Sequence, residues 1–160
     1  MTILTGAGKK FMEELPLGIH TFDEGTPDDV IKFALYGPNA SLGPNNDAYT
    51  TDGEVVGGGY VAGGVTLTNG LRIVGRVGSS RADGVQFSDP YIQPVDDVNV
   101  AVAGVAVRGC MLYNASQANR NIFTMDFGSN FTPSVGVMIP WSLTNVITFG
   151  DTLIPLIGIN

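Results

Sequence analysis

The sequence has very little of what most catalytic and metal sites require. Its 160 residues include one cysteine, Cys110, and one histidine, His20. A single cysteine excludes an intramolecular disulfide framework, and a structural zinc site needs about four Cys or His ligands. A Ser-His-Asp or Cys-His centre would have to use His20, which has no nucleophile signature near it in the sequence. We therefore expect no catalytic residue, no cofactor, no metal and no enzymatic activity.

Charge is also scarce. Only 14% of the residues are charged, against about 25% in a typical soluble domain. The net charge is −7 and the eight basic residues are scattered, apart from the pair Lys9-Lys10, whereas phosphate binding needs clustered Lys and Arg. No apolar run approaches the roughly 20 residues that cross a bilayer, and residues 1–10 lack the apolar segment of a secretory signal. The expectation is a protein made in a cytoplasm that binds neither nucleic acid nor membrane.

Apolar and turn-forming residues are abundant instead, with 44% hydrophobic residues, 22 glycines and 9 prolines. Ile31, Phe33 and Leu35 alternate with other side chains, which predicts a half-buried strand over residues 30–36. Asn69-Gly70 predicts a hairpin between the strands at 65–67 and 71–77. Residues 37–53 are expected to form a turn-rich loop, and residues 78–99 to be irregular apart from short strands at 85–87 and 91–93. Further strands are expected at 98–113, 121–127, 135–139 and 146–149.

Residues 98–113 form the longest apolar run, with Arg108 as its only charge. Such a run predicts a strand covered on both faces. A short helix is expected over residues 9–15 and should end at Pro16 and Gly18. These elements predict an all-β fold, a β-sandwich or jelly-roll-like single domain with a short N-terminal helical arm. Its parts are an arm with a short helix over 1–20, a β-sandwich domain over 21–150 and a C-terminal tail over 151–160.

Three stretches carry a resemblance to a known group of proteins. Residues 29–36 (DVIKFALY) are followed by 49–55 (YTTDGEV), then by the glycine-rich 57–67 (GGGYVAGGVTL), and last by 108–114 (RGCMLYN) with 126–129 (DFGS). In this order the chain resembles small virion structural proteins of tailed bacteriophages. The resemblance covers roughly residues 10–130 and implies a capsid cement or decoration protein with no catalytic residues.

Such a protein would bind the major capsid protein shell, stabilise it against internal DNA pressure, and lie on the capsid surface of the virion. We expect self-association as a dimer or trimer, because symmetric contacts would cover the apolar surface of a charge-poor chain. Apolar and aromatic residues are the candidates for a partner interface, although core packing is the commoner role for such side chains. They are Phe11, Met12, Leu15, Tyr36, Tyr49, Tyr60 and Trp141.

Two alternatives stay open from the sequence. A tail, neck or fibre component that binds a host-surface glycan or another virion protein would expose aromatics in the loops 37–53 and 78–99. An enzyme would need a carboxylate pair such as Asp96 with Asp126, because the sequence offers no set of nucleophile, base and orienting residue.

Overall fold

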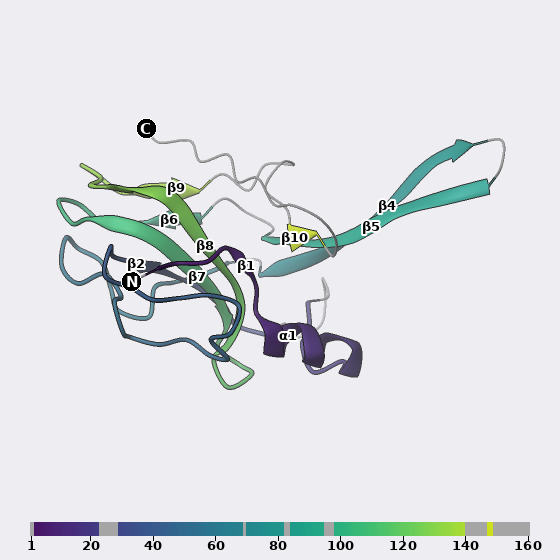
Figure 1. The fold of residues 1–160 in the computed structure, drawn as a ribbon, viewed down its shortest axis with the longest axis horizontal. Helices are drawn as coiled ribbons and strands as arrows, with labels where there is room; N and C mark the ends of the chain where they lie inside the picture. Colours follow the sequence, from purple (N-terminus) through teal and green to yellow (C-terminus); the bar gives the residue numbers. More distant parts are fainter. Residues whose placement is uncertain are drawn as a thin grey trace.

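The structure is a computed structural model that describes residues 2–22, 29–68, 70–81, 84–94, 98–139 and 147–148. These ranges are mostly strand, with one short α-helix followed by a 3-10 turn (Figure 1). The prediction of a small all-β fold is confirmed.

The largest unit is an antiparallel five-stranded sheet in the order β1-β8-β7-β2-β3. Its strands are β1 (Gly6–Ala7), β2 (Ile31–Tyr36), β3 (Val65–Thr66), β7 (Val107–Asn114) and β8 (Arg120–Phe131). The predicted strand over 30–36 is therefore present as β2. It pairs with β7 along its whole length, from Ile31 opposite Asn114 to Tyr36 opposite Gly109.

Two smaller sheets complete the described strands. β6 (Val98–Val100) pairs with β9 (Val137–Ile139), and the order β10-β5-β4 joins β4 (Leu71–Arg81), β5 (Gly84–Pro94) and β10 (Ile147–Thr148). The predicted run 98–113 is thus two strands, β6 and β7, separated by residues 101–106.

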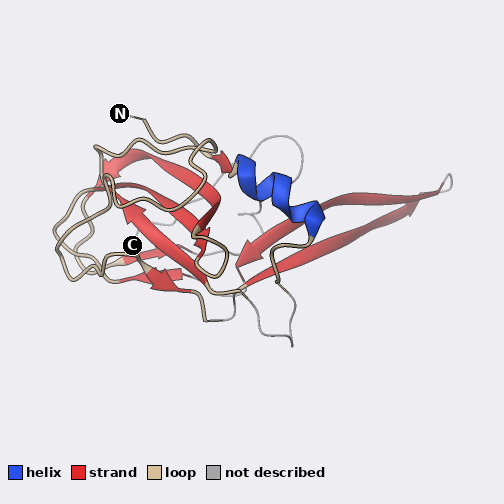
Figure 2. Cartoon of the chain, turned by 90° about the horizontal axis from the view of Figure 1, so that it is seen from below, coloured by secondary structure: helices blue, strands red, loops and turns tan. Residues whose placement is uncertain are grey.

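β4 and β5 form a long hairpin that projects from the body in both views (Figures 1 and 2). Two predictions were wrong here. Residues 78–94 are largely strand rather than irregular, and the hairpin predicted at Asn69-Gly70 does not form, because β3 pairs with β2 whereas β4 pairs with β5. The strands expected at 71–77, 85–87 and 91–93 lie inside β4 and β5, so their presence was predicted and their length was not.

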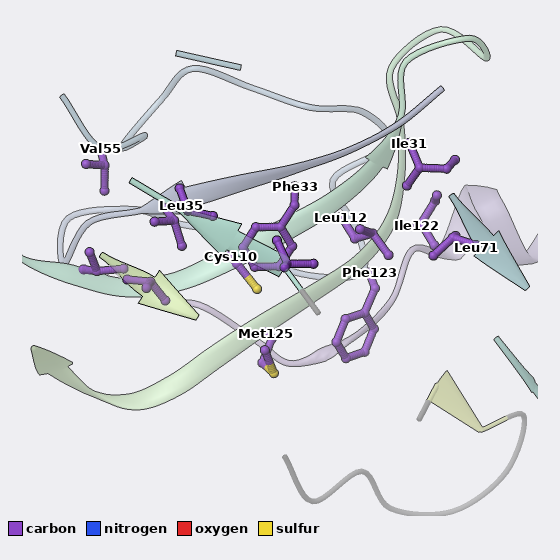
Figure 3. Close-up of a cluster of buried hydrophobic side chains, with 14 of the residues drawn as sticks. Ile31, Phe33, Leu35, Val55, Leu71, Cys110, Leu112, Ile122, Phe123 and Met125 are labelled. Carbon is purple, nitrogen blue, oxygen red and sulfur yellow. The ribbon is translucent and has the colours of Figure 1, made fainter. Parts of the chain in front are cut away.

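The main core lies on one face of the five-stranded sheet (Figure 3). Phe33 from β2, Leu112 from β7 and Met125 from β8 pack there with side chains of the β6–β9 pair, such as Val100 and Val137. Both small strands and the large sheet therefore share one apolar layer.

The opposite face of the same sheet is also covered. Ala34, Tyr36 and Met111 pack there in a second cluster with Ile3 and Leu42. The cover comes from this chain itself, from residues 2–5 and the loop 37–53, so β7 is buried on both faces as predicted. β2 was expected to be half-buried, and that expectation was wrong because the loop shields its second face.

The N-terminal helix was predicted correctly. α1 spans Lys9–Glu14, continues as a 3-10 turn over Leu15–Leu17, and ends at Gly18 with φ of 66°. Phe11 has 0% exposure and belongs to the main core. The helix therefore packs against the body next to β8.

Candidate functional site

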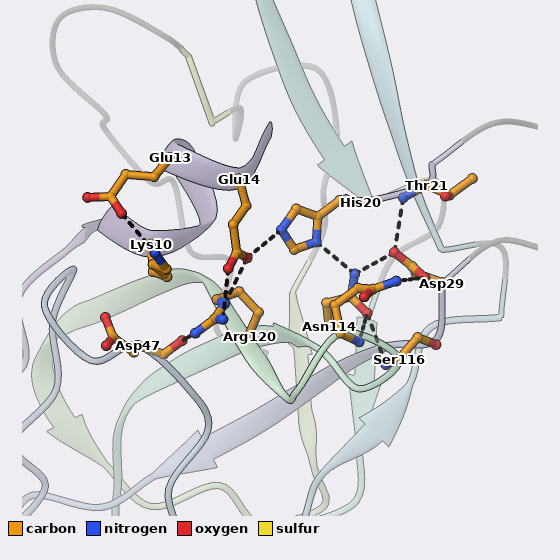
Figure 4. A network of polar contacts seen from close by, with 11 residues as sticks. Lys10, Glu13, Glu14, His20, Thr21, Asp29, Asp47, Asn114, Ser116 and Arg120 are labelled. Carbon is orange, nitrogen blue, oxygen red and sulfur yellow. Dashed lines mark hydrogen bonds and ion pairs between the residues drawn. The ribbon is translucent and has the colours of Figure 1, made fainter. Parts of the chain in front are cut away.

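A buried polar network joins α1 to the turn between β7 and β8 (Figure 4). Glu14, the last residue of α1, accepts two hydrogen bonds from Arg120, with Nε and Nη2 each 2.8 Å from a carboxylate oxygen. His20 Nε2 lies 3.1 Å from Glu14 Oε2. A forked Arg–carboxylate pair of this kind is both strong and geometrically specific.

Asn114, with 0% exposure at the end of β7, uses every hydrogen bond that its side chain offers. Its amide nitrogen donates to His20 Nδ1 at 3.0 Å and to Asp29 Oδ2 at 2.7 Å. Its oxygen accepts from the backbone N–H groups of Ser116 and Gln117. Because Asn114 donates to Nδ1, that nitrogen must be an acceptor, and the proton of a neutral His20 belongs on Nε2, facing Glu14.

The environment keeps His20 neutral. Burial lowers the pKa of His20, and this outweighs the opposing effect of the Glu14 carboxylate. For Glu14, burial raises the pKa, but the hydrogen bonds and charges of Arg120 and His20 outweigh it and lower the pKa overall. The partners of His20 are thus a carboxylate and an amide, an arrangement that holds the helix to the sheet rather than one that activates a nucleophile.

A second polar cluster gathers tyrosines around Glu54. The hydroxyls of Tyr49 and Tyr60 donate to its two carboxylate oxygens at 2.6 and 2.7 Å, and the Gly63 N–H donates at 2.8 Å. Tyr113 of β7 donates to the Gly63 carbonyl at 2.7 Å and stacks on Tyr49 with ring centroids 4.6 Å apart. The cluster clamps the segment 49–63 onto β2 and β7.

These tyrosines stay protonated as donors. Burial raises the pKa of Tyr49 and Tyr60, and hydrogen bonding to the Glu54 carboxylate raises it further. Tyr36 likewise has a pKa raised by burial, and its hydroxyl donates to the Thr50 carbonyl at 2.5 Å. The chemistry of the cluster is hydrogen bonding within the chain.

The structure places the predicted interface residues unevenly. Phe11 and Tyr36 have no exposed surface, so they offer nothing to a partner in this conformation. Four more are partly buried, with Met12, Leu15 and Tyr60 packed against the main core and Tyr49 against the second cluster. Trp141 lies outside the described residues. Tyr36, Tyr49 and Tyr60 do come together, but in the clamp around Glu54.

Three exposed valines that the sequence analysis did not single out lie on the loops 56–64 and 132–136, which together with the loop 101–106 we call the loop end. Val56, Val61 and Val135 are 84%, 73% and 85% exposed there. The loops are tied together, because the Ala103 N–H bonds the Gly58 carbonyl and the Gly104 N–H bonds the Pro133 carbonyl, each at 2.9 Å. For Val56 and Val61 the available signal was their place among the glycines of residues 57–64. Val135 was expected in the strand over 135–139 but lies before β9.

The loop end lies away from the hairpin. Val55 immediately precedes the loop 56–64, and Leu71 is the first residue of β4. These two side chains lie at opposite ends of the main core (Figure 3). The loop end and the projecting hairpin are therefore two separate surfaces of the molecule.

Cys110 and Asp126, two of the remaining candidates for chemistry, have roles inside the fold. Cys110 is 1% exposed in the main core, and burial raises the pKa of its thiol. Asp126 is paired with Arg108 at 2.7 Å, while Asp96 lies outside the described residues. In the ranges that the structure describes, no group of three His, Cys, Asp or Glu side chains is placed to hold a metal ion.

Comparison with known proteins adds no relative: the chain matches no family model, and no curated protein or solved structure matches it. The resemblance to phage virion proteins therefore stays a prediction. None of the helices in the described ranges has the length and apolar character needed to span a bilayer.

Proposed function

We propose that this chain is a virion structural protein, a capsid cement or decoration protein that binds the major capsid protein shell. The loop end is the observation that carries the proposal. Three strongly exposed valines lie on loops that are hydrogen-bonded to one another, and the two polar networks described above hold the fold of this chain together. Such a surface suits binding rather than chemistry.

The energetics of a shell favour this kind of contact. Burial of apolar area contributes about 25 cal/mol per Å², so a patch of a few valines binds weakly by itself. Repetition over a shell raises the effective affinity when copies also contact one another. A decoration protein needs no deep site for this purpose, only a rigid body that holds its loops in place.

We also propose that the body is a β-sandwich of the jelly-roll type. The support is the shared core, in which Val98 and Val100 of β6 and Val137 of β9 pack with Phe33 and Met125 of the five-stranded sheet. Two sheets that face each other across one apolar layer are the defining arrangement of a sandwich.

Binding to isolated capsid shells tests the proposed function. Purified chain is mixed with shells of the encoding phage that lack it, and bound protein is measured by co-sedimentation. We expect the triple variant Val56→Asp, Val61→Asp, Val135→Asp to lose binding while its unfolding transition is unchanged. Leu17→Asp is the matched control, because Leu17 is 72% exposed on the 3-10 turn that follows α1.

Binding of the triple variant at the wild-type level would overturn the role of the loop end. Cryo-electron microscopy of the virion tests the wider proposal. Density at capsomer junctions is expected, whereas density confined to the tail or portal vertex would replace the cement function with a tail, neck or fibre role.

A further inference from the structure

His20 lies in a closed slot between α1 and the sheet. Its side chain has 0% exposure, and its ring centroid lies 4.7 Å from that of Phe11 and 6.0 Å from that of Phe22. Both ring nitrogens face polar groups of the chain, Glu14 on one side and Asn114 on the other (Figure 4). A second proton on the ring must therefore be accommodated by these two neighbours.

Asn114 is held in an orientation that opposes this second proton. Its nitrogen donates to Nδ1 of the ring, so a proton on Nδ1 would set two donors against each other. If the amide turned over to offer its oxygen instead, its bond to Asp29 would be lost, and the N–H groups of Ser116 and Gln117 would face a nitrogen. Protonation of the ring is costly in the closed slot whichever way the amide points.

Gly18 provides a hinge for residues 18–22, the segment that contains the ring. It has φ of +66° with open space around it, so its backbone can rotate without a clash. Leu17 and Ile19, on either side of it, are 72% and 39% exposed. The body therefore covers little of the segment at its first residues.

The same segment is attached to the body at few points besides His20. Phe22 packs in the main core with 8% exposure. The Thr21 N–H donates to Oδ2 of Asp29 at 3.0 Å, and the Thr21 carbonyl accepts the Asp29 N–H at 3.2 Å. Residues 18–22 belong to no strand, so these contacts can open while the five-stranded sheet stays paired.

We propose that His20 is a pH-sensitive switch, in which uptake of a second ring proton from solvent releases residues 18–22 from the slot while the sheet remains folded. The released ring is hydrated and accepts the proton, whereas the closed slot resists it. This local opening goes beyond the proposed function, because it does not depend on binding to a shell.

The charged groups around the ring set the strength of the switch. Within the described residues they are Glu14 from α1, Asp29 from the turn before β2 and Arg120 from β8. Burial of the ring disfavours the second proton most strongly and Arg120 adds to this effect, while the two carboxylates oppose it. Glu14 and Asp29 themselves have lowered pKa values, so they lose their charge only at more acidic pH than the ring.

Hydrogen exchange of the Thr21 amide, followed by NMR on the whole chain, tests the switch. Opening takes up one proton, so the opening constant should rise by up to about tenfold per pH unit as pH falls from 6.5 towards the folded pKa of His20. The protection of Thr21, corrected for the intrinsic exchange rate at each pH, should fall by the same factor.

A series in low concentrations of urea separates local opening from unfolding of the whole chain. The opening constant of Thr21 should hardly change with urea, whereas that of Leu112 in the middle of β7 should rise steeply, because the slope follows the surface that is exposed. An equal urea slope for the two amides would show that the ring is protonated only after the sheet unfolds, and would overturn the proposal.

His20→Gln removes the titrating ring, and the protection of Thr21 should then be flat across the same pH range. A slope as steep as that of the wild-type chain would also overturn the proposal. If the variant does not fold, the ring signals of the wild-type chain decide the matter, because His20 is its only histidine. The folded ring should titrate below pH 6.5, and a midpoint at or above that value would contradict the switch.

Discussion

At the scale of single residues, Asn114 does the most to connect distant parts of the chain. Its four hydrogen bonds link His20 and Asp29 to the turn after β7, across 94 and 85 positions of sequence. We expect Asn114→Ala to lower the free energy of unfolding by about 3 kcal/mol, because buried partners lose their hydrogen bonds. Denaturant unfolding followed by circular dichroism measures this.

Asn130→Ala is the matched control for that measurement, since Asn130 is exposed on β8. It should shift the unfolding free energy by less than about 0.5 kcal/mol. Equal losses for the two variants would show that the network does not hold the helix to the sheet.

His20 makes the stability of the fold depend on pH. Its pKa in the folded chain lies below the ordinary value of 6.5, so below pH 6.5 the unfolded chain takes up a proton more readily than the folded one. The unfolding free energy should therefore fall as pH drops from 6.5 towards the folded pKa. Physically, a proton on Nδ1 would confront the Asn114 amide that now donates to it.

A titration of unfolding midpoints between pH 8 and 5 measures this dependence, with His20→Gln as the comparison. The variant should be less stable at neutral pH but flatter across the window just below pH 6.5. An equal slope in both proteins would assign the acid sensitivity to carboxylates, among them Glu14 and Asp29, whose lowered pKa values place their loss of stability at more acidic pH.

At the scale of elements, a glycine sets how closely the loop 56–64 approaches β2. Gly64 has φ of +72°, and a Cβ there would collide with the Phe33 carbonyl, whereas Gly59 has φ of +84° and open space around it. Gly64→Ala should cost about 3 kcal/mol or more, and Gly59→Ala about 1 kcal/mol for the left-handed backbone alone. Thermal or denaturant unfolding of both variants measures the difference, and equal losses would contradict the close approach.

The helix α1 is also a structural element rather than a free extension. Phe11 is fully buried and packs on His20 and Phe22, with ring centroids 4.7 and 6.1 Å away. Phe11→Ala should lower the unfolding free energy by about 3–5 kcal/mol. Met12→Ala, on a partly buried neighbour, should cost clearly less. If Phe11→Ala leaves stability intact but abolishes shell binding, residues 1–20 act as a docking arm after all.

Elements with a regular local pattern were predictable from the sequence. β2 shows the alternation of a strand, and the helix over 9–14 shows its apolar face and its glycine stop, so both were found. Asn69-Gly70 was misleading, because β3 has only two residues and pairs with β2, more than 30 positions earlier in the chain. Local turn chemistry cannot report which distant strand gains more from pairing.

The polar sites could not be predicted for the same reason. Asn114 and His20 are unremarkable in sequence, and only the fold brings them together. Likewise, a strand was expected over 121–127, whereas β8 continues to Phe131 through a register shift against β7, and Gly128 there has φ of 82°. A bulge needs the partner strand to define it, so a single strand's sequence leaves it hidden.

At the scale of the whole molecule, stability and binding are assigned to different regions. The five-stranded sheet is covered on one face by the main core and on the other by residues 2–5 and the loop 37–53. The loop end, with its exposed valines, and the β4–β5 hairpin lie in separate places on this body. A rigid centre with distinct outer surfaces is the division that a protein acting through contacts requires.

This division predicts an order of local opening across the molecule. Amides of β2 and β7 should exchange slowest, because these strands are neighbours inside the largest sheet and both are buried on two faces. Amides in the outer part of β4 and β5 should exchange fastest, since among the described strands these two pair only with each other there. Hydrogen exchange with mass spectrometry measures the order directly. Slow exchange in the outer part of the β4–β5 hairpin would contradict this order and show that the ribbon is stabilised by more than its own strand pairing.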